Sequence, residues 1–431
     1  MQTSVASRLR SWVDRWGPVL PLLLAEATVW LGFGALLPIM PLYFTRNGTD
    51  LPTLGLVIAA WPATRLVAEP VFGWVADRTA RKPLLLAGLV VAGGATVVPV
   101  LVVGPAAFLL ARGVAGLGAA MYDPAARGYL ADATDRARQG EAFGLYSAAQ
   151  FGGFLFGPVI GGVAAAVTSD PTIVFWVAGS ACLAAALLLA LRLPARPRAA
   201  PVPPAGAGPD DGATGRDGRP RRLANRLLGA AVVLNVGSYF AGGSYEVIWS
   251  LYLTSLGAGL DVIGVTFAAF SIPVLVLSPL AGRLIDRRGG FPILVAGVAT
   301  VALSGPLYPL IPEVWWVVAL SLVEGSAFAL VSPALYALVA RATPVGRSST
   351  AQGIFGAAGT IGTITASLAA GAAANLDLRL PFLVTGAAIG TSLILGLAIG
   401  GGVLPRAMRP RDGATREVAG ETHAEPVAPF R

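Results

Sequence analysis

The chain has 431 residues, of which 55% are hydrophobic and 13% are charged. Soluble globular proteins carry about 25% charged residues, so this composition excludes soluble enzymes and nucleic-acid-binding proteins. The net charge is +8, and its placement along the chain matters more than its sum. The only cysteine, Cys182, excludes an intramolecular disulfide, and the only histidine, His423, lies in a polar tail. We therefore expect neither a metal nor a cofactor.

Long apolar runs dominate the sequence. A bilayer core about 30 Å thick needs roughly 20 apolar residues per spanning helix. The runs predict helices over residues 17–44, 53–76, 83–104, 106–129, 140–167, 172–193, 226–255, 260–284, 291–312, 314–340, 348–374 and 380–404. The first run is too long for a signal peptide and contains Glu26, so we expect it to be retained. The fold class is an all-α membrane protein with twelve transmembrane helices in two sets of six.

The basic residues predict the orientation, because cytoplasmic loops retain Lys and Arg. With the N-terminus inside, all but four of the 31 basic residues fall in cytoplasmic segments or at inner helix ends; the four are Arg46, Arg65, Arg112 and Arg379. Both termini should therefore be cytoplasmic, and the basic excess marks topology. Residues 194–225 are rich in Pro, Gly and Arg and should form a disordered cytoplasmic linker. We expect half-domains over residues 1–193 and 226–404, and a cytoplasmic tail over 405–431.

An internal repeat relates the two halves. A shift of 209 residues aligns Gly34 with Gly243, Pro70 with Pro279, Asp77-Arg78 with Asp286-Arg287, and Gly144 with Gly353. One register across most of a half indicates duplicated six-helix units with a substrate site between them near the midplane. Alternating access is the mechanism that such a repeat favours.

A motif of glycine and charged residues follows the helix over 53–76 and recurs in the second half. Its residues are Gly73, Asp77, Arg78 and Arg81, and the second half repeats it at Gly282, Asp286 and Arg287. The pattern resembles the loop signature of the major facilitator superfamily, although Ala80 stands at the usual second glycine and the second copy lacks the trailing basic pair. An Asp beside Arg can pair with a neighbouring helix end and hold one conformation.

The helix over 140–167 carries a second signature. Gly144, Gly153, Gly157, Pro158, Gly161 and Gly162 match the pattern associated with drug and proton antiporters of this superfamily. Glycines at this spacing permit close helix packing, and the proline bends the segment. Arg112-Gly113 with Gly116 and Gly118 resembles a further element of the superfamily, and Leu31-Gly32 with Pro38 and Pro41 is similar to an element of its twelve-helix drug:proton antiporters. The resemblance covers the chain apart from the linker and tail.

Charged residues inside the helices are candidate machinery because burying them is costly. They are Glu26, Arg65, Glu69, Arg112, Glu246 and Glu324, with Asp123 near a helix end. Arg65 and Glu69 are spaced i, i+4 and should neutralise each other. Glu324 is expected to face Arg112, which leaves Glu26 and Glu246 as the leading proton carriers. In the resembled antiporters an acid on the first helix often has this role, so Glu26 ranks first.

Aromatic residues complete the predicted cavity. Tyr245 and Trp249 flank Glu246, and Phe33, Tyr239, Phe240, Phe270 and Phe355 could line a pocket for a lipophilic ligand with Arg112. The resemblance implies a monomeric, proton-coupled exporter of small amphipathic compounds in the inner membrane. The high content of Ala, Gly and Arg, with a single Lys, indicates a bacterial source. The partners would be the substrate, protons and lipid. Two alternatives stay open: a symporter that imports a sugar, organic acid or lysolipid, and a non-transporting membrane sensor.

Overall fold

The computed structural model describes residues 16–134, 139–194, 225–343 and 348–409. Within these ranges the only regular secondary structure is helical. The first half comprises α2 (Leu20–Leu36), α3 (Met40–Arg46), α4 (Leu51–Ala76), α5 (Arg81–Leu101), α6 (Pro105–Ala133), α7 (Gln139–Thr168) and α8 (Ile173–Arg192). The second half comprises α9 (Arg226–Ser255), α10 (Leu260–Arg288), α11 (Phe291–Leu307), the short 3-10 helix η2 (Tyr308–Leu310), α12 (Val314–Ala342), α13 (Ser348–Ala374), α14 (Leu380–Gly400) and α15 (Val403–Ala407).

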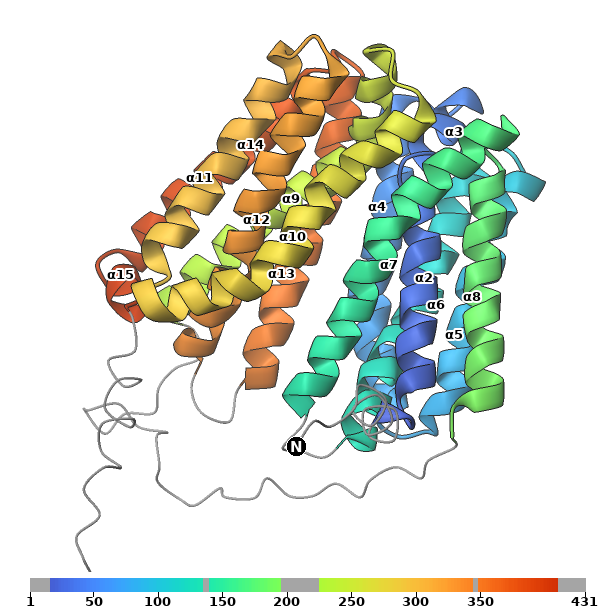
Figure 1. The fold of residues 1–431 in the computed structure, drawn as a ribbon, viewed down its shortest axis with the longest axis horizontal. Coiled ribbons are helices and arrows are strands. Elements are labelled where there is room, and N and C mark those ends of the chain that lie inside the picture. Colours follow the sequence, from blue (N-terminus) through green and yellow to red (C-terminus); the bar gives the residue numbers. More distant parts are fainter. Residues whose placement is uncertain (1–15, 135–138, 195–224, 344–347, 410–431) are drawn as a thin grey trace, which may run out of the picture.

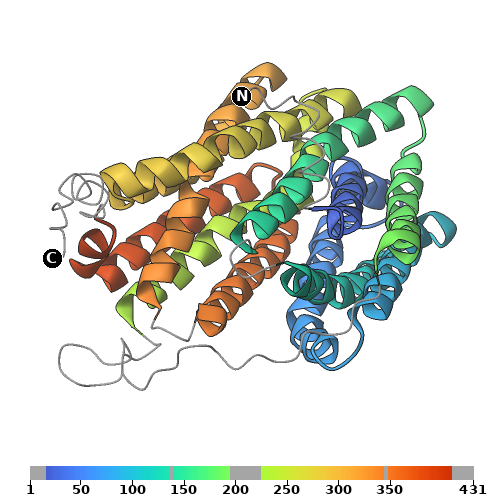
Figure 2. The same cartoon turned by 60° about the horizontal axis from the view of Figure 1, so that its bottom comes forward.

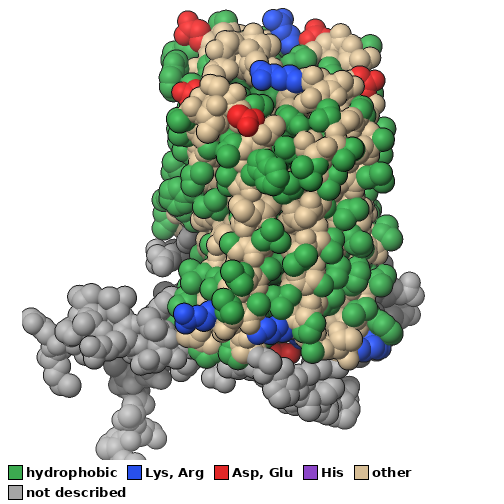
Figure 3. Space-filling view, turned by 90° about the vertical axis from the view of Figure 1, so that its right-hand side faces the viewer, with side chains coloured by type: hydrophobic (Ala, Val, Ile, Leu, Met, Phe, Trp, Pro, Cys, Tyr) green, Lys and Arg blue, Asp and Glu red, His purple; other side chains and the backbone are tan. Residues whose placement is uncertain are grey.

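The helices match the predicted membrane spans. Among the described residues, eleven helices are long and apolar enough to cross a membrane, and α2 with α3 forms a twelfth if the bent pair is one span. The bend of 42° falls between Leu36 and Met40, where Pro38 and Pro41 remove backbone donors from the helix. In Figure 3 hydrophobic side chains cover the middle of the visible face and charged side chains gather at its two ends.

The two halves repeat the same structure at the predicted offset of 209 residues. Helices α4 and α10 begin at Leu51 and Leu260, and α6 and α12 begin at Pro105 and Val314. Buried hydrogen bonds repeat as well: the Tyr43 hydroxyl donates to the Pro99 carbonyl at 3.0 Å, and the Tyr252 hydroxyl donates to the Tyr308 carbonyl at 2.7 Å. The repeat read from the sequence is therefore a repeat of structure.

The two bundles meet at one end and diverge toward the other (Figures 1 and 2). We call the meeting point the joined end; it contains the loops at 47–50, 102–104, 169–172, 256–259 and 375–379. One buried apolar cluster there combines residues of both halves, including Phe44, Phe175, Trp249 and Phe382. The other two buried clusters each belong to one half alone. The described packing therefore joins the halves at one end only.

Part of the predicted domain organisation lies outside the described residues. This applies to 195–224 of the expected linker and to 410–431 of the expected tail. The tail expected from residue 405 begins inside α15, which packs against the start of α11: the Gly290 amide donates to the Met408 carbonyl at 2.8 Å.

Candidate functional site

Glu26 lies on α2 in a buried group of polar side chains inside the first half. Its side chain is fully buried and accepts hydrogen bonds from Trp30 Nε1 at 2.9 Å, Tyr122 Oη at 2.7 Å and Gln150 Nε2 at 2.6 Å. These donors come from α2, α6 and α7. No arginine or lysine within the described ranges forms an ion pair with Glu26. Glu26 is thus a buried acid held by neutral donors.

Arg112 on α6 forms an ion pair that crosses between the halves. Its Nη2 lies 2.7 Å from Glu246 Oε1 on α9, and the two side chains are 7% and 14% exposed. The expectation that Arg112 faces Glu324 is wrong in this conformation. The Glu324 carboxylate instead accepts a hydrogen bond of 2.6 Å from the Tyr308 hydroxyl, beside the hydroxyl of Tyr245. Glu246 rather than Glu324 is therefore the acid that holds the buried guanidinium.

A second charge network lies on α4 and α6. The i, i+4 pair of Arg65 and Glu69 is present at 3.2 Å, as the spacing predicts. Arg65 also pairs with Asp123, and Arg127 bridges Glu69 at 3.3 Å and Asp123 at 3.7 Å. The sequence alone identified Arg65 with Glu69 but not the contributions of Asp123 and Arg127. Two guanidinium groups and two carboxylates balance one another here.

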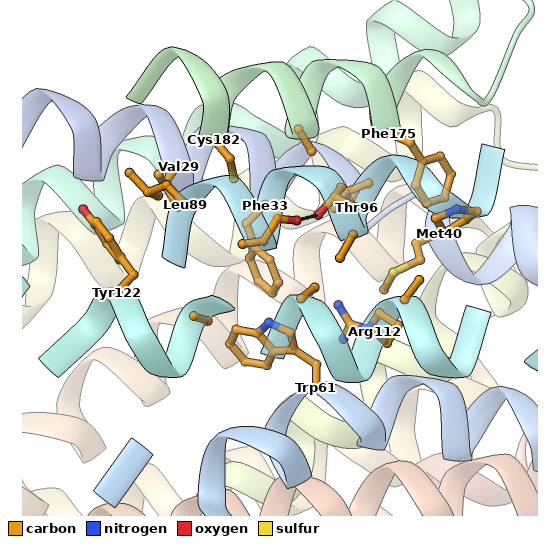
Figure 4. Close-up of a pocket in the computed structure, with 18 of the residues that line it drawn as sticks. Val29, Phe33, Met40, Trp61, Leu89, Thr96, Arg112, Tyr122, Phe175 and Cys182 are labelled. Atoms are coloured by element: carbon orange, nitrogen blue, oxygen red, sulfur yellow. Dashed lines mark hydrogen bonds between the residues drawn. The ribbon is translucent and has the colours of Figure 1, made fainter. Parts of the chain in front are cut away.

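A cavity opens within the first half, between α2, α3, α4, α5, α6 and α8 (Figure 4). Phe33 and Trp61 point into it, with rings 5.3 Å apart and nearly parallel at 28°. Arg112 lines the same cavity, and Arg65 lies over the Trp61 ring at 4.6 Å from its centroid. The cavity reaches Tyr122, which donates to Glu26. It therefore extends from Arg112 of the cross-half ion pair to Tyr122, a hydrogen-bond partner of Glu26.

The other aromatic candidates lie apart from this cavity. Tyr245 and Trp249 pack with Tyr308 and Phe382 in one aromatic cluster of the second half. Phe270 contacts Phe328, and Phe355 contacts Tyr336. Tyr239 is 45% exposed, and Phe240, its neighbour on α9, is partly buried. Of the predicted cavity residues, Phe33 and Arg112 line the cavity that the structure shows.

The glycines of α7 form two different helix contacts. A Cβ added at Gly157 would lie 2.5 Å from the Leu31 carbonyl oxygen on α2, and Gly153 and Gly161 face Ala27 and Ala35 of the same helix. Gly162 instead faces α10 of the second half, where an added Cβ would lie 2.5 Å from the Leu260 carbonyl oxygen. Pro158 contacts both helices, because its ring faces Gly34 of α2 and its carbonyl faces Gly264 of α10. Gly144 has no atom of the described residues near its added Cβ. One motif thus supports both the bundle and the joint between halves.

The loop motif after α4 is tied to α6 and α8. Arg81 lies 3.0 Å from Asp132 on α6, and 4.0 Å from Asp77, whose side chain is 67% exposed. Lys82 donates to the Ala190 and Leu193 carbonyls at the end of α8, at 2.8 and 2.7 Å. These partners were not identified from the sequence.

Two remaining members of the motif lie in the same region. Arg78 stacks on Trp74 at 4.0 Å, and Gly73 approaches Pro124 of α6. In the second copy, Gly282, Asp286 and Arg287 all lie in the last turns of α10, and the surroundings of their side chains lie outside what the structure describes.

Known proteins share both sequence and fold with this chain. The sequence model of the Major Facilitator Superfamily matches residues 22–241 and 231–429. The chain belongs to the Major Facilitator Superfamily. Quinolone resistance protein NorA of Staphylococcus aureus is 29% identical over 140 residues, 32% of this chain and 36% of NorA. Multidrug resistance protein 2 of Bacillus subtilis is 32% identical over 132 residues, 31% of this chain and 33% of the relative. The matched region therefore spans about a third of each relative.

Solved structures of the superfamily share the fold over nearly the whole chain. A bacterial homologue of the human lysosomal transporter Spinster, in an inward-facing and occupied conformation, has a TM-score of 0.73 at 15% identity, with 91% of this chain and 97% of that chain covered. The nucleoside transporter NupG has a TM-score of 0.69 at 14% identity, with 88% and 99% covered. As a superfamily member, the chain is a multi-span membrane transporter of small molecules and not an enzyme. Its multi-span fold, together with its bacterial drug-resistance relatives, indicates the inner (plasma) membrane of a bacterium.

Proposed function

We propose that this transporter is a proton-coupled exporter of small amphipathic compounds that works by alternating access. The observation that carries the proposal is Glu26, a fully buried acid whose described partners are neutral donors. A proton carrier must lose and regain its proton, and a permanent cationic partner would hold it ionised. Glu246 has such a partner in Arg112, so it exchanges its proton only when that pair separates.

The joined end supports alternating access. The halves share a buried cluster there, and α7 and α10 touch at Gly162 and Leu260. With the termini in the cytoplasm, as the basic residues predict, the joined end faces outward and the structure is an inward-facing state. Export requires that this joint opens and that the opposite ends of the bundles approach. The drug-resistance proteins that match a third of the chain support the choice of amphipathic compounds as substrates.

Transport in energised, inverted vesicles tests the proposal. We expect accumulation of a lipophilic aromatic dye inside the vesicles, loss of accumulation with a protonophore, and proton release when the substrate binds in detergent. Accumulation that persists with the protonophore, or substrate movement only in the opposite direction, would contradict proton-driven export. No transport by a folded, reconstituted protein would favour the sensor alternative.

Glu26→Gln tests the assignment of the carrier. The variant keeps the size of the side chain but cannot exchange a proton, so pH-gradient-driven efflux and substrate-induced proton release should both be lost. The new side-chain amide would also place an N–H donor against one of the donors of Trp30, Tyr122 and Gln150. This mismatch lowers the stability of the fold by about 1–3 kcal/mol, so thermal unfolding is needed to check that the variant folds. Glu313→Gln, the same change at an exposed helix end, is the matched control. Wild-type proton release by Glu26→Gln would refute the assignment.

A further inference from the structure

The repeat places different residues at the ends of the helices opposite the joined end, which we call the inner ends. In the first half, Arg81 at the start of α5 lies 3.0 Å from Asp132 near the end of α6, so an ion pair connects these two helices. The shift of 209 residues puts Gly290 at the position of Arg81 and Arg341 at that of Asp132. These two residues cannot bond each other, because the Gly290 amide and the Arg341 guanidinium are both donors.

The short helix α15 supplies the acceptors that the second half lacks at these positions. It lies at the end of the second half away from the joined end (Figure 1). The Gly290 amide donates to the Met408 carbonyl at 2.8 Å, and Arg341 Nη1 donates to the Ala407 and Arg409 carbonyls at 2.8 and 3.1 Å. The last carbonyls of a helix have no partner within it, so they are free to accept these bonds. Three successive carbonyls thus join the start of α11 to the end of α12.

Apolar contacts hold α15 in this place. Leu404 and Met408 are buried in the apolar cluster of the second half, whereas Val403 and Arg406 of the same segment are exposed. A Cβ added at Gly290 would lie 2.7 Å from Met408 Cε. An arginine at position 290 would therefore displace Met408, which gives a physical reason why the second loop motif has no basic residue there.

The path of the Arg81 side chain is also specific to the first half. Its guanidinium lies against Gly128 of α6, where an added Cβ would overlap it. The equivalent residue of α12 is Ala337, whose methyl group takes up the corresponding space. The first half therefore has room for a long side chain at this point, and the second half has a docked segment of backbone instead.

We propose that α15 and Arg341 hold the inner ends of α11 and α12 together, in place of the Arg81–Asp132 pair of the first half. Arg341 is the positioning residue of this latch. Alternating access moves each half as a unit, so the inner ends of a half have to stay together while the two halves approach and separate. The inference goes beyond the proposed export and does not depend on the direction of transport or on proton coupling.

Hydrogen–deuterium exchange of the full-length protein in detergent tests the contact. Leu404→Asp puts a charge into the buried contact and should speed amide exchange at the start of α11 and the end of α12 at least about tenfold. Val403→Asp makes the same change at an exposed position and should leave exchange within about twofold. Arg341→Gln removes two bonds without burying a charge and should also speed exchange, unlike Arg406→Gln at an exposed position. Equal exchange within both matched pairs would overturn the proposal.

Transfer of the ion pair from the first half to the second distinguishes a latch from ordinary packing. Arg341→Asp alone sets a carboxylate against the α15 carbonyls and should speed exchange at both helix ends. Adding Gly290→Arg and Ala337→Gly copies the residues at positions 81, 128 and 132, so a new ion pair can form where α15 was docked. The triple variant should exchange more slowly than Arg341→Asp at both helix ends. Exchange as fast as in the single variant would refute the equivalence of the two latches.

Transport of ethidium by reconstituted vesicles measures what the latch contributes. Leu404→Asp and Arg341→Asp should slow transport at least about fivefold while ethidium affinity stays within about twofold, because the latch acts on conformation. The triple variant should recover most of the lost rate. Wild-type rates in variants with accelerated exchange would contradict a role in transport. Absence of ethidium transport by the wild-type protein would instead count against the proposed function, while the exchange measurements still decide whether α15 holds the helix ends.

Discussion

Removal of the Glu246 charge should open the joined end. In the observed conformation the Arg112 side chain is 7% exposed, and among the described residues its amino group bonds only Glu246 and, at 3.4 Å, the Ile58 carbonyl. Glu246→Gln leaves this guanidinium buried without a counter-charge. Breaking a buried pair in this way costs about 3–5 kcal/mol, and each 1.4 kcal/mol is a factor of ten in an equilibrium. The joined state should therefore lose about a hundredfold or more in population relative to a state in which the halves separate.

Spin-label distances across the joined end measure this change. Labels at Val167 on α7 and Asp261 on α10, in a Cys182→Ser background, lie on opposite halves at exposed positions. In Glu246→Gln the distance distribution should shift to longer values, whereas the unsubstituted background keeps one short population. An unchanged distribution would show that the pair does not hold the joint.

A double variant separates the loss of the pair from the burial of an unpaired charge. Arg112→Gln with Glu246→Gln leaves neither ion behind, and removing both partners of a buried pair is often close to neutral. The double variant should therefore lie nearer to the wild-type distribution than Glu246→Gln alone. If the double variant opens the joint further than the single variant, the reasoning from an unpaired guanidinium is wrong.

Two further predictions concern the packing and loop motifs. Gly157→Leu should abolish efflux and destabilise the protein by several kcal/mol, because its Cβ meets the α2 backbone, while Gly144→Leu should leave thermal stability within about 0.5 kcal/mol. Equal thermal stability of the two variants would show that the close packing at Gly157 is not required. Asp132→Asn should slow efflux more than Asp77→Asn, because Arg81 lies closer to Asp132 than to Asp77. Both variants should leave substrate affinity unchanged. A loss of affinity in either variant would contradict a conformational role.

The helices and the repeat could be predicted because both depend on local patterns. Apolar runs determine the spans, and the 209-residue shift aligns helix starts such as Leu51 with Leu260. The pair of Arg65 and Glu69 was also predictable, since i, i+4 geometry is independent of the rest of the fold. The break at Leu36 to Met40 was missed although Pro38 and Pro41 signal it.

The partner of Arg112 could not be predicted from the sequence. Glu246 and Glu324 are both buried acids of the second half, and which of them meets Arg112 depends on how the halves pack. That packing is set by contacts such as Gly162 against Leu260, which no local pattern encodes. The α5 wall of the cavity was missed for a related reason: its alanines and Thr96 have the same composition as any small-residue helix contact.

The two halves share the hydrogen bonds that pack their helices but not their buried charged residues. Tyr43 and Tyr252 make the same bond in both halves, but the position of Glu26 is taken in the second half by Asn235, which donates to the Phe355 carbonyl at 2.7 Å. Shared packing lets two bundles rock against each other around one axis. A ligand or proton can bias that motion only through groups that differ between the two states. We therefore expect Glu26 and Arg112, which the second half lacks, to couple protons and ligand to transport. We expect the packing that both halves share to allow the movement of one half against the other.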